Sequence, residues 1–216
     1  MDVNYVFEIL PYIIDGFKVT AVVFLLTLLF SIPLGLVISS LSTLNYPVLN
    51  IFITTYTWIF RGTPLLLQLY FGMYGLPAFG ITLNRINVAI LIFSLNYGAY
   101  FTEIFRGSIQ SISIEQTEVS YVLGFNKFQT YIYIIIPQAL KRSIQAVSNE
   151  VITLIKDTAL VAAIALNDLL RNAKEIVSRD FRVEAFFVVA VLYILLSLVV
   201  VKSSKKIETR FAYYRW

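Results

Sequence analysis

Five long apolar segments constrain what this chain can fold into. They cover residues 17–40, 48–71, 86–105, 139–166 and 183–201. As helices, segments of about 20 residues cross the roughly 30 Å hydrocarbon core of a bilayer. Only 14% of the 216 residues are charged, against about a quarter in soluble domains. The sequence therefore predicts an all-α polytopic membrane bundle of five transmembrane helices, formed as a single domain over residues 1–216.

The distribution of charge indicates an orientation. The last fifteen residues carry Glu208 and a larger number of cations, which are Lys202, Lys205, Lys206, Arg210 and Arg215. Because cytoplasmic flanks of membrane spans are rich in Lys and Arg, we expect the C-terminus inside and, with five spans, the acidic N-terminus outside. Residues 167–182 also fall outside, although they carry four basic and three acidic side chains. The basic tail directly follows an apolar span, so we expect it beside the membrane and not on nucleic acid.

Composition also excludes several kinds of chemistry. The chain has no cysteine and no histidine, so disulfides, thiolate chemistry, His-based triads and His-ligated metal sites are absent. No stretch has the form G-x-x-x-x-G-K-[ST], which cradles nucleotide phosphates. We therefore expect no ATP site, cofactor or metal in this chain, and no catalytic residues.

The fourth apolar segment contains ionisable residues in "SNEVITLIKDTALV", residues 148–161. At about 100° per residue, Glu150, Thr153 and Asp157 share one face of a helix, and Asn149 and Lys156 share the adjacent one. A charge inside a bilayer costs roughly 2.5–3.5 kcal/mol even on the lenient insertion scale. Such residues usually face a bundle interior or an aqueous path. The pattern predicts one polar face on this span.

The third segment repeats this pattern in "NYGAYFTEIFRG", residues 96–107. Asn96, Tyr100, Glu103 and Gly107 form one stripe, and Arg106 can pair with Glu103 across one turn. Two interpretations stay open for the stripe. It could clamp one helix to another, with Arg106 extending to the membrane border, or it could line a polar cavity.

The second segment is interrupted at "FRGTPLLLQ", residues 60–68. Gly62 and Pro64 disfavour a continuous helix, whereas Thr63 could cap a new helix that has Pro64 at its first position. The exposed N–H groups of such a half-helix, beside Arg61, would attract an anion. Broken helices often mark transporter substrate sites, although a proline kink without a ligand is the alternative.

Depth connects these features. At 1.5 Å per residue, Arg61, Asn96 and Glu150 each lie roughly 15–20 Å into their spans, near the bilayer midplane. An arginine and a helix end on one side, with a carboxylate on the other, suit an amino acid that carries a cationic side chain. We expect Glu150 to bind the cation, and Arg61 and Thr63 to bind the α-carboxylate. The stripe residues Asn96, Tyr100, Glu103, Asn149, Thr153 and Asp157 complete the predicted site.

The connection between the third and fourth spans, residues 107–131, is longer than a membrane hairpin needs. A short helix is predicted over residues 114–123, with Gly124 as its stop signal, and Pro137 predicts a break before the fourth span. This helix could be an amphipathic surface helix or could dock a partner.

The same connection resembles a known family. "EVSYVLGFNKFQTYIYIIIP", residues 118–137, is similar to the E-A-A-x(3)-G-x(9)-I-x-L-P signature of permease subunits in ATP-binding cassette importers. Glu118, Gly124 and Pro137 match in spacing, as does Ile134, whereas Val119 and Ser120 replace both alanines. "RGTPLLLQLYF", "NYGAYFTEIFRGSIQSI", "PQALKRSI" and "NEVITLIKDTALV" resemble stretches of the polar amino-acid permeases in that group.

The resemblance implies a type I importer fold in a bacterial cytoplasmic membrane. It implies a dimer, plausibly of two copies of this chain, with two ATPase subunits that bind ATP and Mg and with an extracytoplasmic substrate-binding protein. A coupling helix within residues 107–137 would contact the ATPase through Glu118, Val119, Ser120, Gly124 and Phe125. The acid of the "NE" pair contacts cationic substrate in related permeases, which corresponds to Glu150 here.

Other classes of function compete with an ATP-driven importer of arginine, lysine or histidine as interpretations of the sequence. A proton- or ion-coupled secondary transporter could use Glu150, Asp157 and Glu103 as proton sites. An intramembrane enzyme has little support, because no nucleophile–base pair stands out. A scaffold subunit would leave the charges near the midplane without a role. The sequence does not select one amino acid, and glutamine-type substrates stay possible.

Overall fold

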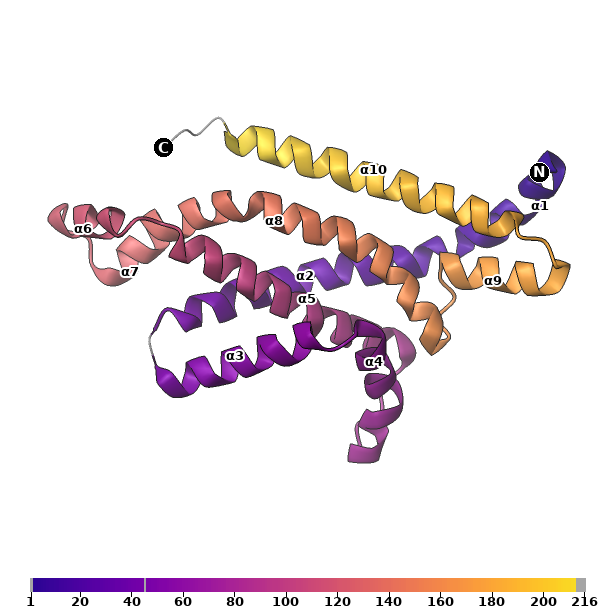
Figure 1. Ribbon diagram of the computed structural model, residues 1–216, viewed down its shortest axis with the longest axis horizontal. Coiled ribbons are helices and arrows are strands. Elements are labelled where there is room, and N and C mark those ends of the chain that lie inside the picture. The colour runs from indigo at the N-terminus through magenta and orange to yellow at the C-terminus, as the bar shows by residue number, and fades with distance from the viewer. Residues whose placement is uncertain (1, 45, 213–216) are drawn as a thin grey trace.

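The computed structural model describes residues 2–44 and 46–212, and every regular element in these ranges is helical (Figure 1). The first half contains α1 (Val3–Asp15), α2 (Phe17–Ser42), α3 (Pro47–Gly62), α4 (Leu65–Tyr70), the π-helical turn η1 (Phe71–Gly75) and the 3-10 turn η2 (Leu76–Phe79). The second half contains α5 (Arg85–Gln110), α6 (Ile114–Val122), α7 (Lys127–Thr130), the π-helical turn η3 (Tyr131–Ile135), α8 (Ile136–Asp157), the 3-10 turn η4 (Thr158–Ile164), α9 (Leu169–Asp180) and α10 (Glu184–Ala212). Arg215 of the predicted basic tail lies outside the described residues.

The structure confirms the predicted all-helical class. Not every predicted apolar segment, however, forms one continuous apolar helix. Among the described residues, three helical stretches are long and apolar enough to cross a membrane, at Val3–Ser42, Arg85–Gln110 and Glu184–Arg210. The second predicted span is divided between α3 and the shorter apolar stretch Leu65–Phe79. The fourth, α8, has a strongly amphipathic sequence, because one of its faces is polar. Most residues of the candidate site lie on these two elements, the interrupted second span and the amphipathic α8.

The packing of α2 against α5 forms the centre of the molecule. The buried residues of α2 recur every three or four positions and are mostly small: Thr20, Val23, Thr27, Ser31, Gly35 and Ser39. Small residues let transmembrane helices approach closely, and a Cβ added at Gly35 would lie 2.5 Å from the Cβ of Phe101 on α5. Phe93, Tyr97 and Phe101 form the largest buried side chains of this core. The close contact fixes α5 as a rigid support for the site.

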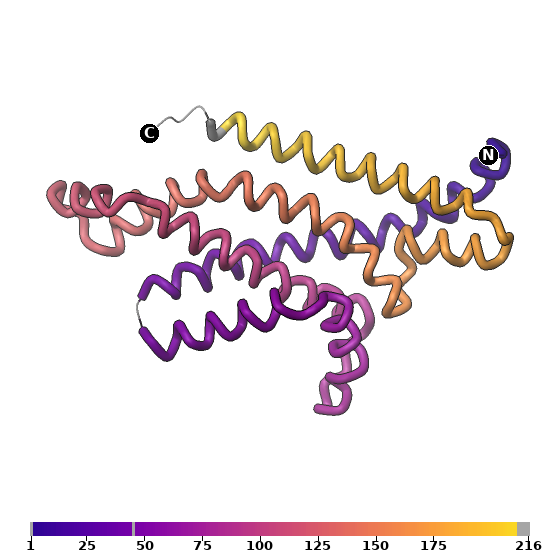
Figure 2. Tube along the Cα trace, viewed as in Figure 1, coloured from indigo at the N-terminus to yellow at the C-terminus, as the bar shows by residue number. Residues whose placement is uncertain are grey.

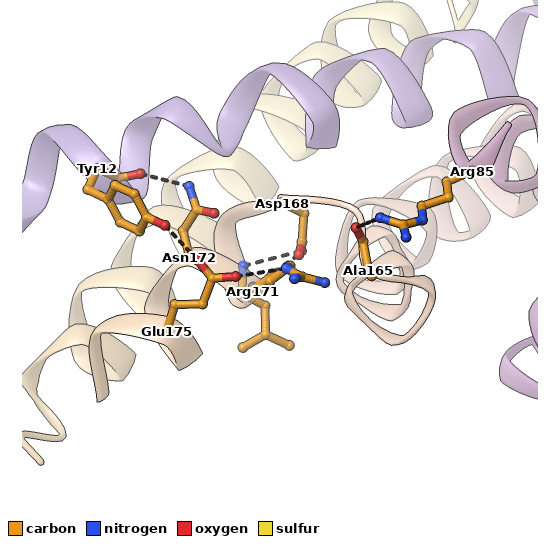
Figure 3. A network of polar contacts seen from close by, with 8 residues as sticks. Tyr12, Arg85, Ala165, Asp168, Arg171, Asn172 and Glu175 are labelled. Atoms are coloured by element: carbon orange, nitrogen blue, oxygen red, sulfur yellow. Dashed lines mark hydrogen bonds and ion pairs between the residues drawn. The ribbon is translucent and has the colours of Figure 1, made fainter. Parts of the chain in front are cut away.

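A second core joins α1, α9 and α10, including Ile9, Ile13, Leu169, Ile176 and Val188. Figure 3 shows the polar contacts beside it: the Tyr12 hydroxyl donates to Glu175 Oε2 at 2.5 Å, and Asn172 Nδ2 donates to the Tyr12 carbonyl at 2.8 Å. Asp168 is fully buried and caps α9 by accepting from the backbone N–H of Arg171 at 3.0 Å.

Most of the charged segment 167–182 therefore forms α9 (Leu169–Asp180), an amphipathic helix that packs on α1 and α10. In the same region, Arg85 Nη1 donates to the carbonyl of Ala165 at 3.2 Å.

The connection between α5 and α8 forms one end of the elongated molecule. Here α6 and α7 lie at the end where α10 finishes, and α1 begins at the opposite end (Figure 2). The expected short helix is confirmed as α6: it ends at Val122, and Gly124 follows with a φ of 86°. The expected break at Pro137 takes the form of a change in helix type: the π-helical turn η3 ends at Ile135, and α8 begins at Ile136 with Pro137 in its first turn. The chain stays helical from α7 through η3 into α8, because a first-turn position does not need the missing N–H of proline.

Candidate functional site

A cavity of about 590 Å³ opens where the break between α3 and α4 faces α5 and α8. Its lining comes from three separate parts of the chain: Arg61, Gly62, Thr63, Pro64 and Leu65 at the break, Asn96, Tyr97 and Tyr100 on α5, and Glu150, Thr153, Asp157 and Leu160 on α8 and η4. Seven of the nine predicted substrate-binding residues are among them. Glu103 and Asn149 are not, since Glu103 lies one turn beyond Tyr100 and Asn149 is exposed elsewhere on α8.

Hydrogen bonds from side chains stabilise the break between α3 and α4, so it is more than a proline kink. Asn96 is buried and donates from Nδ2 to the carbonyl of Phe60 at 2.8 Å and to Gln68 Oε1 at 3.0 Å. Gln68 Nε2 in turn donates to the Phe60 carbonyl at 2.9 Å and to the Thr63 hydroxyl at 2.8 Å. The carbonyls at the end of α3 have no helical partners. The side-chain amides of Asn96 and Gln68 both donate to one of these carbonyls, that of Phe60.

Thr63 does not have the predicted capping role. It is the residue after α3, and its hydroxyl donates backwards to the carbonyl of Ile59 at 2.8 Å. Pro64 stands at the N-cap position of α4, and no side chain caps that end within the described residues. The hydroxyl hydrogen of Thr63 is therefore already used, and it cannot at the same time be donated to a carboxylate.

Arg61 is held by α5 rather than standing free in the cavity. Its Nη1 lies 3.7 Å from Glu103 Oε2, and its guanidinium carbon lies 5.3 Å from the centre of the Tyr100 ring. Glu103 also accepts a hydrogen bond from Arg106, as the spacing of the two residues predicts. One carboxylate thus lies between two cations.

The α8 side of the cavity is acidic. Glu150 and Asp157 both face the cavity and are half-buried. Neither belongs to an ion pair within residues 2–44 and 46–212. Asp157 Oδ2 accepts a hydrogen bond of 2.7 Å from the Tyr97 hydroxyl. A cavity that presents two carboxylates without cationic partners provides a site for a cation.

Sequence reasoning missed two residues, Gln68 and Tyr97. Tyr97 is almost fully buried, and only the packing of α5 on α8 brings its hydroxyl to Asp157. Gln68 lies in an apolar run, "LLLQLYF". A lone polar amide inside such a run was the one available signal, because a buried amide needs partners.

The α6–α7 end carries the residues expected to contact an ATPase. Glu118, Val119 and Gly124 are exposed, and Phe125 is partly so. Ser120 differs, because it is only 2% exposed and its hydroxyl lies 2.8 Å from that of Thr130. Ser120 therefore holds α6 against α7 and offers no docking surface in this arrangement.

Comparison with known proteins agrees with the architecture. Residues 31–213 match the family described as binding-protein-dependent transport system inner membrane component. The L-cystine transport system permease protein TcyB of Bacillus subtilis (strain 168) is 37% identical over 195 residues, which cover 88% of this chain and 83% of that protein.

Two further proteins are similar to this chain over most of its length. The histidine/lysine/arginine/ornithine transport system permease protein HisM of Salmonella typhimurium (strain LT2) is 37% identical over 212 residues, covering 91% of this chain and 90% of that protein. The crystal structure of an amino acid ABC transporter with histidines superposes with a TM-score of 0.88 at 30% identity, over 97% of this chain and 99% of the matched chain. The chain belongs to the family of binding-protein-dependent transport system inner membrane components, as a permease subunit of an amino-acid ATP-binding cassette importer.

Proposed function

We propose that this permease subunit carries a cationic amino acid, of the arginine, lysine or histidine class, through the cavity between α3–α4, α5 and α8. The observation that carries the proposal is the pair of carboxylates, Glu150 and Asp157, that face the cavity without cationic partners in the described chain. The cationic group on the cavity wall, Arg61, shares the Glu103 carboxylate with Arg106, so these three residues together carry one positive charge. Glu150 and Asp157 carry two negative charges, and the net charge left for a ligand to neutralise is therefore negative.

Glu150 binds the side-chain cation in this proposal, and the α-carboxylate lies toward Arg61 and the amino end of α4. Asn96, Tyr100, Thr153 and Asp157 shape the cavity between these ends. The amides of Asn96 and Gln68 are used within the junction, so Asn96 acts by holding the break in place. Thr63 contributes through its position on the wall, because its hydroxyl donates to Ile59. Asn149 is exposed on α8 outside the cavity lining and has no part in this proposal.

The relatives at equal identity differ in the substrates that their names state, L-cystine for one and histidine, lysine, arginine and ornithine for the other. Overall similarity consequently does not select between these substrates. The unpaired acidic wall favours the cationic class, since an ionised partner makes a hydrogen bond roughly twice as strong as a neutral one.

Energy would come from partner subunits that dock on the α6–α7 end. That end exposes large apolar side chains, which are Ile114, Val119, Tyr121, Val122, Leu123 and Phe128. Exposed apolar clusters of this kind mark interaction sites. In this proposal two ATPase subunits, which hold ATP and Mg, cover that surface on a pair of permease subunits. The α6–α7 end is then cytoplasmic, and an extracytoplasmic binding protein delivers the amino acid at the opposite end.

A homodimer is proposed because one chain contains both halves of the site, the carboxylates and the helix break. A proton-coupled carrier that uses Glu150 and Asp157 is the alternative function. It would leave the apolar α6–α7 surface without a partner, so that surface favours the ATP-driven mechanism.

The test is ligand binding by the purified complex with its ATPase subunits, screened against labelled arginine, lysine, histidine, glutamine and cystine. Losing a hydrogen bond to a charged group costs about 1.5–3 kcal/mol, so Glu150→Gln should weaken arginine binding about 10- to 100-fold. Glu208→Gln is the control, because Glu208 is a partly buried acid on α10 that does not line the cavity. Unchanged arginine affinity in Glu150→Gln, or preferential binding of a neutral amino acid by the unaltered complex, would refute the cationic assignment.

A further inference from the structure

Three charged residues form a cluster that the cavity alone does not explain. Arg61 at the end of α3 and Arg106 on α5 both approach the same carboxylate, that of Glu103. The Glu103 side chain is 19% exposed, whereas the two arginine side chains are 43% and 40% exposed. Glu103 is thus a largely buried carboxylate between two more accessible cations. If one arginine moves away, the other still neutralises the carboxylate.

The two ion pairs are unequal. Arg106 donates a hydrogen bond to Glu103 and lies one turn away on the same helix, so the contact is local. Arg61 approaches Glu103 only to 3.7 Å, with no hydrogen bond between them, and it comes from a different helix. Arg106 would keep Glu103 neutralised if Arg61 moved. The Arg61 contact is consequently the one that can open.

The cluster lies beside the cavity on the side that faces α6 and α7. Helix α5 lines the cavity at Asn96 and Tyr100, passes Glu103 and Arg106, and ends at Gln110 next to α6. Helix α3 reaches the cavity with Arg61 in its last turn. The Arg61–Glu103 contact therefore joins α3 to α5 between the cavity and the α6–α7 end.

We propose that Arg61, Glu103 and Arg106 form an ionic latch, in which Glu103 is a positioning residue that holds Arg61 until the carboxylate of an incoming amino acid replaces it. This rests on the proposed function. Arg61 lines the cavity and its guanidinium is accessible there, so a second carboxylate can reach it. When Arg61 turns to the ligand, its ion pair with Glu103 is released, and Arg106 retains Glu103.

The latch sets a requirement on the substrate. A cationic ligand without a carboxylate could still bind Glu150 and Asp157, but it could not displace Glu103 from Arg61. Arginine should therefore open the latch, whereas agmatine, which is the same molecule without its carboxylate, should not. A cluster that only held the two helices together would not discriminate between these ligands once bound.

The first experiment measures ATP hydrolysis by the detergent-solubilised complex with arginine or agmatine added directly, so that the selectivity of the binding protein does not enter. In the unaltered complex arginine should stimulate hydrolysis and agmatine should not. Glu103→Gln should raise hydrolysis without ligand several-fold and bring the ratio of the hydrolysis rates measured with arginine and with agmatine close to one. Glu103→Asp should restore part of both, and Glu208→Gln should match the unaltered complex. Wild-type basal hydrolysis, or a wild-type ratio, in an assembled Glu103→Gln complex would overturn the latch.

A second experiment covers the case in which Glu103→Gln fails to assemble. Because the chain has no cysteine, Arg61→Cys with Glu103→Cys places two unique thiols at the latch. Because this variant lacks the ion pair, its hydrolysis without ligand should be raised, and a short, reducible bifunctional thiol reagent should lower it to the level of the unaltered complex, with reduction restoring it. Each single-cysteine variant should be unaffected by the reagent. Raised hydrolysis that persists in the cross-linked double variant would show that a connection between α3 and α5 at this point does not restrain hydrolysis, which refutes the proposal.

The two proposals fail differently. If no cationic amino acid binds or stimulates the unaltered complex, the proposed function is wrong. If arginine stimulates hydrolysis but Glu103→Gln and the cross-link change nothing, the latch alone is wrong.

Discussion

Replacing Gly35 by alanine tests whether the close contact of α2 with α5 holds the bundle together. The added Cβ would lie 2.5 Å from the Cβ of Phe101 and 2.9 Å from both the Phe101 carbonyl carbon and the Thr102 nitrogen. Two of these three atoms belong to the backbone, so no rotamer change relieves the overlap. Ordinary contacts begin at 3.4 Å, which requires the helices to separate by roughly 1 Å at this point.

That separation sets the expected magnitude. A radial gap of about 0.5–1 Å forfeits roughly a quarter to a half of the attraction of each contact it opens. Overpacking a well-packed core costs about 1–3 kcal/mol. Alanine regains up to about 1 kcal/mol over glycine in a helix interior. We therefore expect Gly35→Ala to lower the free energy of unfolding by up to about 2 kcal/mol, net of the gain in helix propensity.

The assay is unfolding of the purified protein in mixed micelles by titration with SDS, followed by circular dichroism. Gly107→Ala is the matched control, because Gly107 also lies inside a long helix but an added Cβ there would have no neighbour within 4 Å. It should leave stability unchanged or raise it by up to about 1 kcal/mol. Equal stability of the two variants would refute the steric argument.

Two further predictions concern the ends of the molecule. At the α6–α7 end, Gly124→Val forces a β-branched residue into a φ of 86°, which costs about 1–2 kcal/mol. Arginine-stimulated ATP hydrolysis should fall several-fold while the amount in the membrane stays the same, and wild-type stimulation would contradict a docking role for this turn. At the α9 end, hydrogen bonds from Arg179 and Tyr5 lower the pKa of Asp180 from 3.8 to about 2. The lowered pKa stabilises the fold above about pH 4, and this contribution is lost as the pH falls toward about 2. The thermal midpoint of the protein should decline over that range, and a decline of the same size in Asp180→Asn would show that another group is responsible.

Much of the architecture follows from local patterns. Apolar length predicts the spans, and the helical period places Glu150, Thr153 and Asp157 on one face of α8, which the structure confirms. Gly124 correctly marks the end of α6. Two helices were not predicted: α1, which precedes the first long apolar segment, and α9, which is only twelve residues long. Both are stabilised chiefly by packing against one another and against α10, because short helices are marginal on their own.

The sequence by itself determined which residues share a face and that the second span is interrupted at Gly62–Pro64, because helical periodicity and the chemistry of glycine and proline act over a few residues. Only the tertiary structure decided which partners those faces meet. Arg61 is paired with Glu103, Thr63 donates back into α3, and Ser120 lies inside the α6–α7 turn. A charged or hydroxyl group has several possible partners, and the packing of helices that are distant in sequence selects among them. For this reason the polar cavity lies where the sequence predicts it, whereas several residues on its wall have partners other than those predicted.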